Sequence, residues 1–100
     1  MQPTSIFDVK ELCGMIYRLP NTLVPTPINS VVLKDNYMVG ITDTHHVGMR
    51  YDTLHVKKPI PINSTVLDEL FHTDKPYIGF DDELNYEFYD SKDDIPTPCI

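Results

Sequence analysis

Proline placement limits what this chain can fold into more than any other feature of the sequence. The chain holds 9 prolines, and two dense groups of them lie in residues 23–27 and 57–62. Proline has no backbone N–H and a fixed φ, so neither group suits a helix interior or a central strand. We therefore expect both groups to be extended connectors between short regular elements.

Length and composition predict one small domain. With 100 residues, 41% of them hydrophobic and 23% charged, the chain has the composition of a globular protein. We expect a single domain over residues 1–94 and a proline-rich tail over 95–100. No apolar run approaches the roughly 18 residues of a membrane helix, and the N-terminus lacks a leader pattern. A cytoplasmic protein with no membrane partner is expected.

The N-terminal segment has the pattern of an amphipathic helix. Residues 5–8 resemble a capping box, with Asp8 in the place of the usual Glu. Apolar residues then recur at helical spacing: Ile6, Val9, Leu12, Cys13 and Ile16. This pattern predicts a helix over residues 5–18.

Strand signals dominate after this helix. The expected strands cover residues 31–33, 37–42, 46–56, 77–80 and 84–89, because β-branched and aromatic residues alternate there between turn residues. A short helix ending at Phe71, capped by Asn63 or Ser64, interrupts them. The predicted fold class is α+β or mainly β, with the N-terminal helix packed on an antiparallel sheet of about five strands.

Two parts of the chain resemble each other. Residues 27–33, PINSVVL, and residues 61–67, PINSTVL, agree at six of seven positions. One interpretation is a pseudo-twofold internal repeat, in which two related halves share one core. The other is local reuse of residues that suit the junction between a turn and a strand. The repeat interpretation conflicts with the predicted elements at one point, because Ser30 is expected to start a strand whereas Ser64 lies where a helix is capped. In a true repeat, one of these two predictions is wrong.

Catalytic and metal-site signals are weak. One group resembles a metal or acid–base cluster, and its three histidines are His45, His46 and His55. Asp43, Asp52 and His72 are further candidates for this group. Neighbouring residues on a strand point to opposite faces, so His45 and His46 cannot chelate one ion from a regular strand. The cysteines have no metal-binding spacing, and no phosphate-binding or nucleophile-elbow motif occurs. We predict no catalytic residue, no metal and no cofactor.

The charge is concentrated near the C-terminus. Residues 1–80 carry eight acids and seven bases, whereas residues 81–100 carry seven acids against Lys92, which accounts for most of the net charge of -7. Leu84, Tyr86 and Phe88 are expected to face the core, which would expose Tyr89 as a contact residue among carboxylates. The candidate partner-binding residues are Asp81, Asp82, Glu83, Glu87, Tyr89, Asp90, Asp93 and Asp94.

This surface predicts a non-enzymatic, protein-binding or inhibitory module that docks on a basic protein site, such as that of a nucleic-acid-binding protein. Direct binding of nucleic acid is disfavoured because the acids repel phosphates. Such a module would suit an accessory protein of viral type, by analogy alone. The other interpretation is that the acids keep the domain soluble and protect an edge strand from aggregation. Two alternatives stay open: a structural subunit of a homo-oligomer or virion-type assembly, and a small-ligand or metal-dependent protein using His45, His46 and His55.

Overall fold

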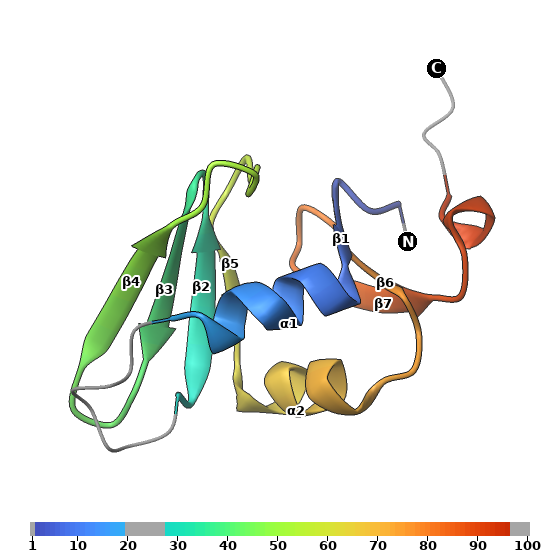
Figure 1. Ribbon diagram of the computed structural model, residues 1–100. Coiled ribbons are helices and arrows are strands. Elements are labelled where there is room, and N and C mark those ends of the chain that lie inside the picture. Colours follow the sequence, from blue (N-terminus) through green and yellow to red (C-terminus); the bar gives the residue numbers. More distant parts are fainter. Residues whose placement is uncertain (1, 20–27, 97–100) are drawn as a thin grey trace.

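Two helices and two antiparallel sheets form the part of the chain that the computed structural model describes, residues 2–19 and 28–96 (Figure 1). The elements are β1 Ser5–Asp8, α1 Val9–Tyr17, β2 Ser30–Lys34, β3 Tyr37–Ile41, β4 His46–Arg50, β5 Ile60–Ile62, α2 Ser64–His72, β6 Tyr77–Phe80, β7 Tyr86–Tyr89 and a 3-10 turn Lys92–Asp94. The strand orders are β1-β6-β7 and β4-β3-β2-β5. The α+β class is confirmed. The prediction of a single sheet of about five strands is wrong, because the strands divide between two sheets.

The first turn of the predicted N-terminal helix is a strand. Residues Ser5–Asp8 pair with β6, so that Ile6 lies opposite Gly79. The helix starts only at Val9, and Asp8 is its N-cap, with a side-chain oxygen that accepts the Glu11 N–H at 3.0 Å. The carboxylate that suggested the end of a capping box is therefore the cap itself. Pairing with a distant strand overrides the local helical pattern, as tertiary contacts often do.

The four-stranded sheet is built around β2, which pairs with β3 on one side and β5 on the other. The turn from β2 to β3 contains Asn36 at φ 59°, a left-handed conformation that Asn tolerates. The third predicted strand is too long, since β4 ends at Arg50. The second predicted connector, residues 57–62, ends in β5, and its Pro61 is tolerated because β5 is an edge strand. The first connector, residues 23–27, lies outside the described residues, as do residues 97–100 of the predicted tail.

The two similar segments fold differently. Ser30 starts strand β2, whereas Ser64 starts helix α2, which Asn63 caps by accepting the Val66 N–H at 3.0 Å. Both local expectations hold. The structure therefore shows no internal repeat, and the shared residues fit the interpretation of local reuse at turns.

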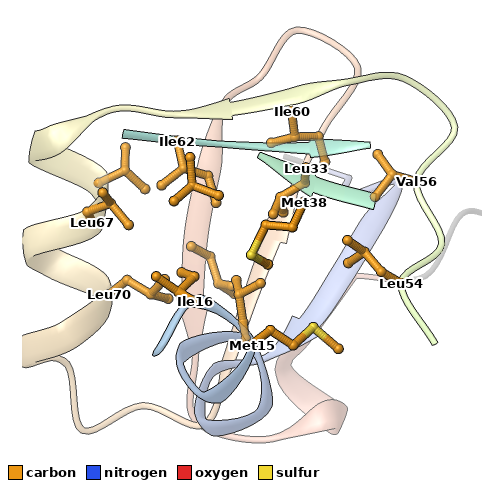
Figure 2. Close-up of a cluster of buried hydrophobic side chains, with 14 of the residues drawn as sticks. Met15, Ile16, Leu33, Met38, Leu54, Val56, Ile60, Ile62, Leu67 and Leu70 are labelled. Atoms are coloured by element: carbon orange, nitrogen blue, oxygen red, sulfur yellow. The ribbon is translucent and has the colours of Figure 1, made fainter. Parts of the chain in front are cut away.

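One hydrophobic cluster joins both helices and both sheets (Figure 2). Helix α1 contributes Leu12, Met15 and Ile16, and α2 contributes its buried Leu67 and Leu70. The sheets and the segment after β4 contribute the rest, including Val31, Leu33, Met38, Leu54, Val56, Ile60, Ile62, Ile78 and Phe80. Within the described ranges, neither helix has the length and apolar character that crossing a membrane requires.

Tyr51 fixes the segment after β4 onto α1. Its hydroxyl is buried and donates to the Met15 carbonyl at 2.6 Å, and its backbone N–H donates to Asn36. We expect Tyr51→Phe to lower the free energy of unfolding by about 1 kcal/mol, the usual net worth of such a bond. Urea unfolding measures this, with Tyr17→Phe as the control because Tyr17 is 75% exposed. Equal stability of the two variants would contradict the role of the bond.

The cap of α2 gives a second stability prediction. Asn63→Ala should lower the free energy of unfolding by about 1 kcal/mol, because the Val66 N–H loses its side-chain acceptor. Ser64→Ala, at the next position, should change stability by no more than a few tenths of a kcal/mol, since Ser64 is exposed and starts the helix rather than caps it. Urea unfolding of the pair decides which residue is the cap. A larger loss for Ser64→Ala would show that the assignment is wrong.

Candidate functional site

Asp81 organises the turn between β6 and β7. Its carboxylate accepts the backbone N–H groups of Glu83 and Asn85, each at 2.9 Å, and the Asn85 side-chain amide at 3.1 Å. Two backbone bonds close the same turn, from the Asp81 N–H to the Asn85 carbonyl and from the Leu84 N–H to the Asp81 carbonyl. Asp81 is therefore a structural residue of the turn, whereas sequence reasoning treated it as one carboxylate among several.

These bonds favour the ionised form of Asp81. The Asn85 side-chain amide is the largest influence that lowers the pKa of this carboxyl from its ordinary value of 3.8; desolvation opposes it, and the two backbone N–H groups act in the same direction as the amide. A lowered pKa in the folded protein means that ionisation stabilises the fold. This stabilisation is present above pH 3.8 and is lost as the pH falls through the lower folded-state value.

Leu84 lies at the tip of this turn in an unusual backbone conformation. Its φ is 67°, a left-handed conformation that costs a residue with a Cβ roughly 1–2 kcal/mol. Its side chain is 43% exposed rather than buried. The prediction that Leu84 faces the core is wrong, because β7 begins only at Tyr86. A strained, exposed leucine directly after three acids was missed because the turn geometry could not be inferred from sequence.

The remaining carboxylates are exposed, at three places around β7. Asp82 and Glu83 lie at the turn, and the Thr4 hydroxyl donates to Asp82 at 3.2 Å. Glu87 lies on β7 itself. After β7 come Asp90, whose carboxylate is 4.0 Å from the Lys75 ammonium, and then the two acids of the 3-10 turn, Asp93 and Asp94. The structure thus spreads the predicted residues along one hairpin and its continuation instead of gathering them at one point.

Tyr89 is not the exposed contact residue that the alternation predicted. It is 6% exposed, and its ring lies over Gly79, where an added Cβ would be 3.1 Å from the Tyr89 ring and 2.8 Å from Pro3. The N-terminal Pro3 therefore covers the outer face of this sheet next to Tyr89, which sequence alternation within one hairpin could not reveal. Tyr89 is removed from the set of exposed candidates.

Tyr86 connects the hairpin to the rest of the protein. Its hydroxyl donates to a carboxylate oxygen of Glu69 on α2 at 2.6 Å. This bond, together with desolvation, raises the pKa of the Tyr86 hydroxyl. The half-buried ring of Tyr86 also packs against Phe80 and Phe88, as expected for a residue that faces the core. The hairpin that carries the acids is thereby fixed to α2.

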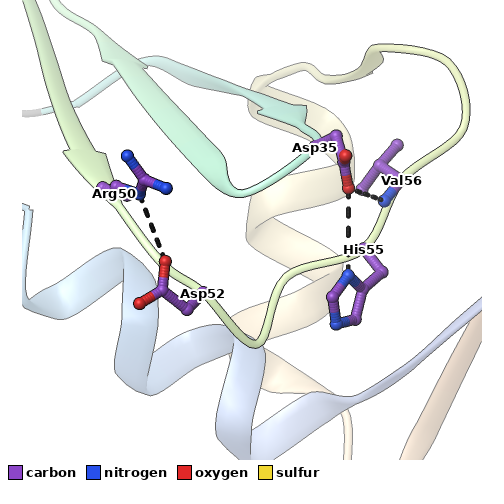
Figure 3. A network of polar contacts seen from close by, with 5 residues as sticks. All are labelled: Asp35, Arg50, Asp52, His55 and Val56. Carbon is purple, nitrogen blue, oxygen red and sulfur yellow. Dashed lines mark hydrogen bonds and ion pairs between the residues drawn. The ribbon is translucent and has the colours of Figure 1, made fainter.

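Separate local partners contact His45, His55 and His72. His45 is bonded to the Thr44 hydroxyl at 2.8 Å, and His72 to the Asp68 carbonyl at 2.7 Å. His55 lies 3.9 Å from Asp35 (Figure 3). His46 lies on β4, and Asp52, predicted to share its strand, follows the end of β4 and pairs with Arg50 at 3.2 Å (Figure 3). Among residues 2–19 and 28–96, no group of three His, Cys, Asp or Glu side chains is placed to hold a metal.

One small pocket opens where β1 meets α1. It holds about 120 Å³ and is lined by Ile6, Phe7, Asp8, Glu11, Leu12, Met15 and Leu54. Sites for drug-sized ligands and cofactors usually hold roughly 300 Å³ or more. A wider and more open depression of about 390 Å³ lies between Thr4–Ser5 and the segment Asp35, His55, Val56 and Lys57. Neither hollow gathers the acidic candidates.

The chain was compared with protein-family models, curated proteins and solved structures, and none of them matches it. We therefore infer a function from the geometry of the acidic hairpin.

The origin of the lowered Asp81 pKa can be tested by titration. In Asn85→Ala the carboxyl loses the amide that lowers its pKa most, so its NMR titration midpoint should rise toward 3.8 while the turn keeps its backbone bonds. Unfolding of this variant should depend less on pH across the acidic range, because the folded and unfolded pKa values become closer. An unchanged midpoint for Asp81 would show that the amide is not the cause.

Proposed function

We propose that this chain is a non-enzymatic protein-binding module whose acidic β6–β7 hairpin docks on a basic protein surface. The observation that carries the proposal is the ordered tip of the hairpin. There Asp81 holds the turn from inside, while Asp82, Glu83 and Leu84 are presented to solvent. An ordered turn loses less conformational entropy on binding than a flexible one, so it can use more of its contact energy for affinity.

The tip combines the two properties that a docking element needs. Exposed carboxylates attract a basic partner and raise the rate of encounter. Leu84 adds an apolar contact at the same point, in a backbone conformation that persists only because the surrounding turn imposes it. Leu84 thus takes the place that sequence reasoning gave to Tyr89.

Nearby lysines set the direction from which a partner approaches. Lys57 and Lys58 line a narrow crevice together with Asp81, Asp82 and Leu84. They offset part of the negative charge on that side of the tip. The net negative surface then lies on the sides that carry Glu83 and Glu87, which favours contact there. We infer a basic protein as partner, such as one that binds nucleic acid, and an inhibitory or accessory role.

Neutralising the exposed acids tests the proposal. We expect the variant Asp82→Asn, Glu83→Gln, Glu87→Gln to bind its partner at least about tenfold more weakly at low salt, because attraction to a basic surface is lost. Asp81 is left unchanged since it holds the turn. The measurement is capture from a lysate of the source organism, followed by a titration of the captured protein at about 50 mM and about 500 mM salt.

A charge-matched control removes three exposed acids elsewhere: Glu11→Gln, Asp68→Asn and Asp74→Asn. This control should bind as the wild type does. A further variant, Leu84→Gly, should raise the free energy of unfolding by up to about 1 kcal/mol and still weaken binding, because glycine relieves the strain and removes the apolar contact. Equal binding by the hairpin variant and the control would refute the proposed site.

A further inference from the structure

The outer face of the four-stranded sheet carries an ordered set of side chains. The register places Lys34, Tyr37 and Arg50 in one cross-strand row. The next rows contain Val32, Val39 and Gly48, with Pro61 beside Val32, and then Ser30, Ile41 and His46. The neighbouring positions on these strands, such as Val31 and Leu33, point into the core instead.

This face is apolar where a solvent-facing sheet is usually polar. An antiparallel sheet with one wet face normally alternates apolar and polar residues, yet the central strands present Val32, Val39 and Ile41 outward, each half-buried. Tyr37 is 41% exposed. Its ring lies across Gly48, where an added Cβ would be 2.7 Å from the ring. Apolar surface of this kind, rimmed by polar groups, is typical of an interaction site.

The charges around this apolar centre are basic. Lys34 and Arg50 flank Tyr37, and both are exposed. Arg50 forms an exposed ion pair with Asp52, with 3.2 Å between Nε and Oδ1. Because the pair is exposed, the Arg50 guanidinium remains accessible to a second carboxylate. The ten outward positions of β2, β3, β4 and β5 include no Asp or Glu. This face therefore suits an acidic partner with an apolar contact residue.

The same chain carries a surface with those properties. The tip Asp82–Glu83–Leu84 presents two exposed carboxylates beside an exposed leucine. Within one molecule the tip lies beside the start of β5, because Asp82 and Leu84 line one crevice with Lys57, Lys58 and Ile60. The outer face of the four-stranded sheet is turned away from the helices that cover its inner face. Ile60 points to the inner side of its sheet, so the tip of the same molecule lies on the side away from the outer face. A tip can therefore reach this face from a second molecule.

We propose that the outer face of the sheet β4-β3-β2-β5 binds the acidic hairpin of a second copy of this chain. Lys34 and Arg50 pair with the carboxylates of Asp82 and Glu83, and Leu84 packs on the patch of Val32 and Val39. This inference rests on the proposed function, because it uses the acidic hairpin as the docking element. It goes beyond that function by assigning the surface that receives the hairpin. The contact is heterologous, so each bound copy leaves one tip and one face free for further copies.

Single-stranded nucleic acid is the other class of partner that an aromatic residue flanked by cations could bind. The net charge of -7 opposes a phosphate backbone at long range. The apolar patch beside Tyr37 offers no polar group that could bind a phosphate, whereas it can pack against Leu84. The second copy is therefore the occupant that the charges and the apolar residues favour together.

Charge reversal tests the contact from both sides. The tip variant is Asp82→Lys, Glu83→Lys, and the face variant is Lys34→Glu, Arg50→Glu; all four positions are exposed, so both variants should fold. Sedimentation velocity is measured over a range of concentrations at about 50 mM and about 500 mM salt. We expect the wild-type mass to rise with concentration at low salt only. Each variant alone should associate at least about tenfold more weakly.

Mixing the two variants is the decisive measurement. In the mixture the intact tip of one variant meets the intact face of the other, and the reversed pair is also complementary, so association should return. A wild type that stays monomeric throughout would overturn the inference, yet it leaves the proposed function standing if the hairpin variant still loses its captured partner. If the face variant instead loses binding to a fluorescent single-stranded oligonucleotide, the face is a nucleic-acid surface and the second copy is not its occupant.

Discussion

The pairing of β1 with β6 is the interaction on which the rest of this structure depends. It joins Ser5 to Phe80 and Asp8 to Tyr77, two segments at opposite ends of the chain. Because Asp8 ends the strand, its carboxylate is placed to cap α1. The same pairing brings Pro3 over Gly79 and the Thr4 hydroxyl to Asp82. One long-range ladder thus determines where the first helix starts, why Tyr89 is buried, and how the acidic turn is supported.

The helices turn two small sheets into one packed structure. A three-stranded sheet such as β1-β6-β7 has little apolar area of its own and gains stability by packing against another element. Helices α1 and α2 supply that surface to both sheets at once, as the shared hydrophobic cluster shows. The bond from Tyr51, which follows β4, to Met15 and the bond from Tyr86 on β7 to Glu69 add polar connections to α1 and α2. The arrangement fixes to α2 the acidic hairpin that we propose as a docking element.

Local signals predicted what local physics determines. The start of α2, predicted to be capped by Asn63 or Ser64, the β2–β3 hairpin and strand β6 have local signals, and the sequence indicated these elements correctly. The structure then selects Asn63 as the cap. The predicted helices and strands together indicated the α+β class. Strand β1 and the three residues of β5 could not be inferred, because each exists only through a partner that lies far away in the chain. For the candidate site, the acids were identified from charge alone, while the roles of Asp81, Leu84 and Tyr89 depend on turn geometry and on cover from the N-terminus.

In the proposed function, neighbouring residues of the acidic hairpin serve stability and recognition separately. The ionised carboxylate of Asp81 stabilises the turn through its hydrogen bonds. It could pair with a cation of a partner only by giving up these bonds, which would loosen the turn. Glu83 makes no such turn bonds with its side chain, and Asp82 accepts one exposed bond from the Thr4 hydroxyl, so both carboxylates remain available for long-range attraction. Leu84 costs stability through its backbone conformation and exposes apolar area that the folded chain does not use. A residue that is unfavourable on both counts makes physical sense if another surface covers it, and the apolar patch on the outer face of the four-stranded sheet has the matching character.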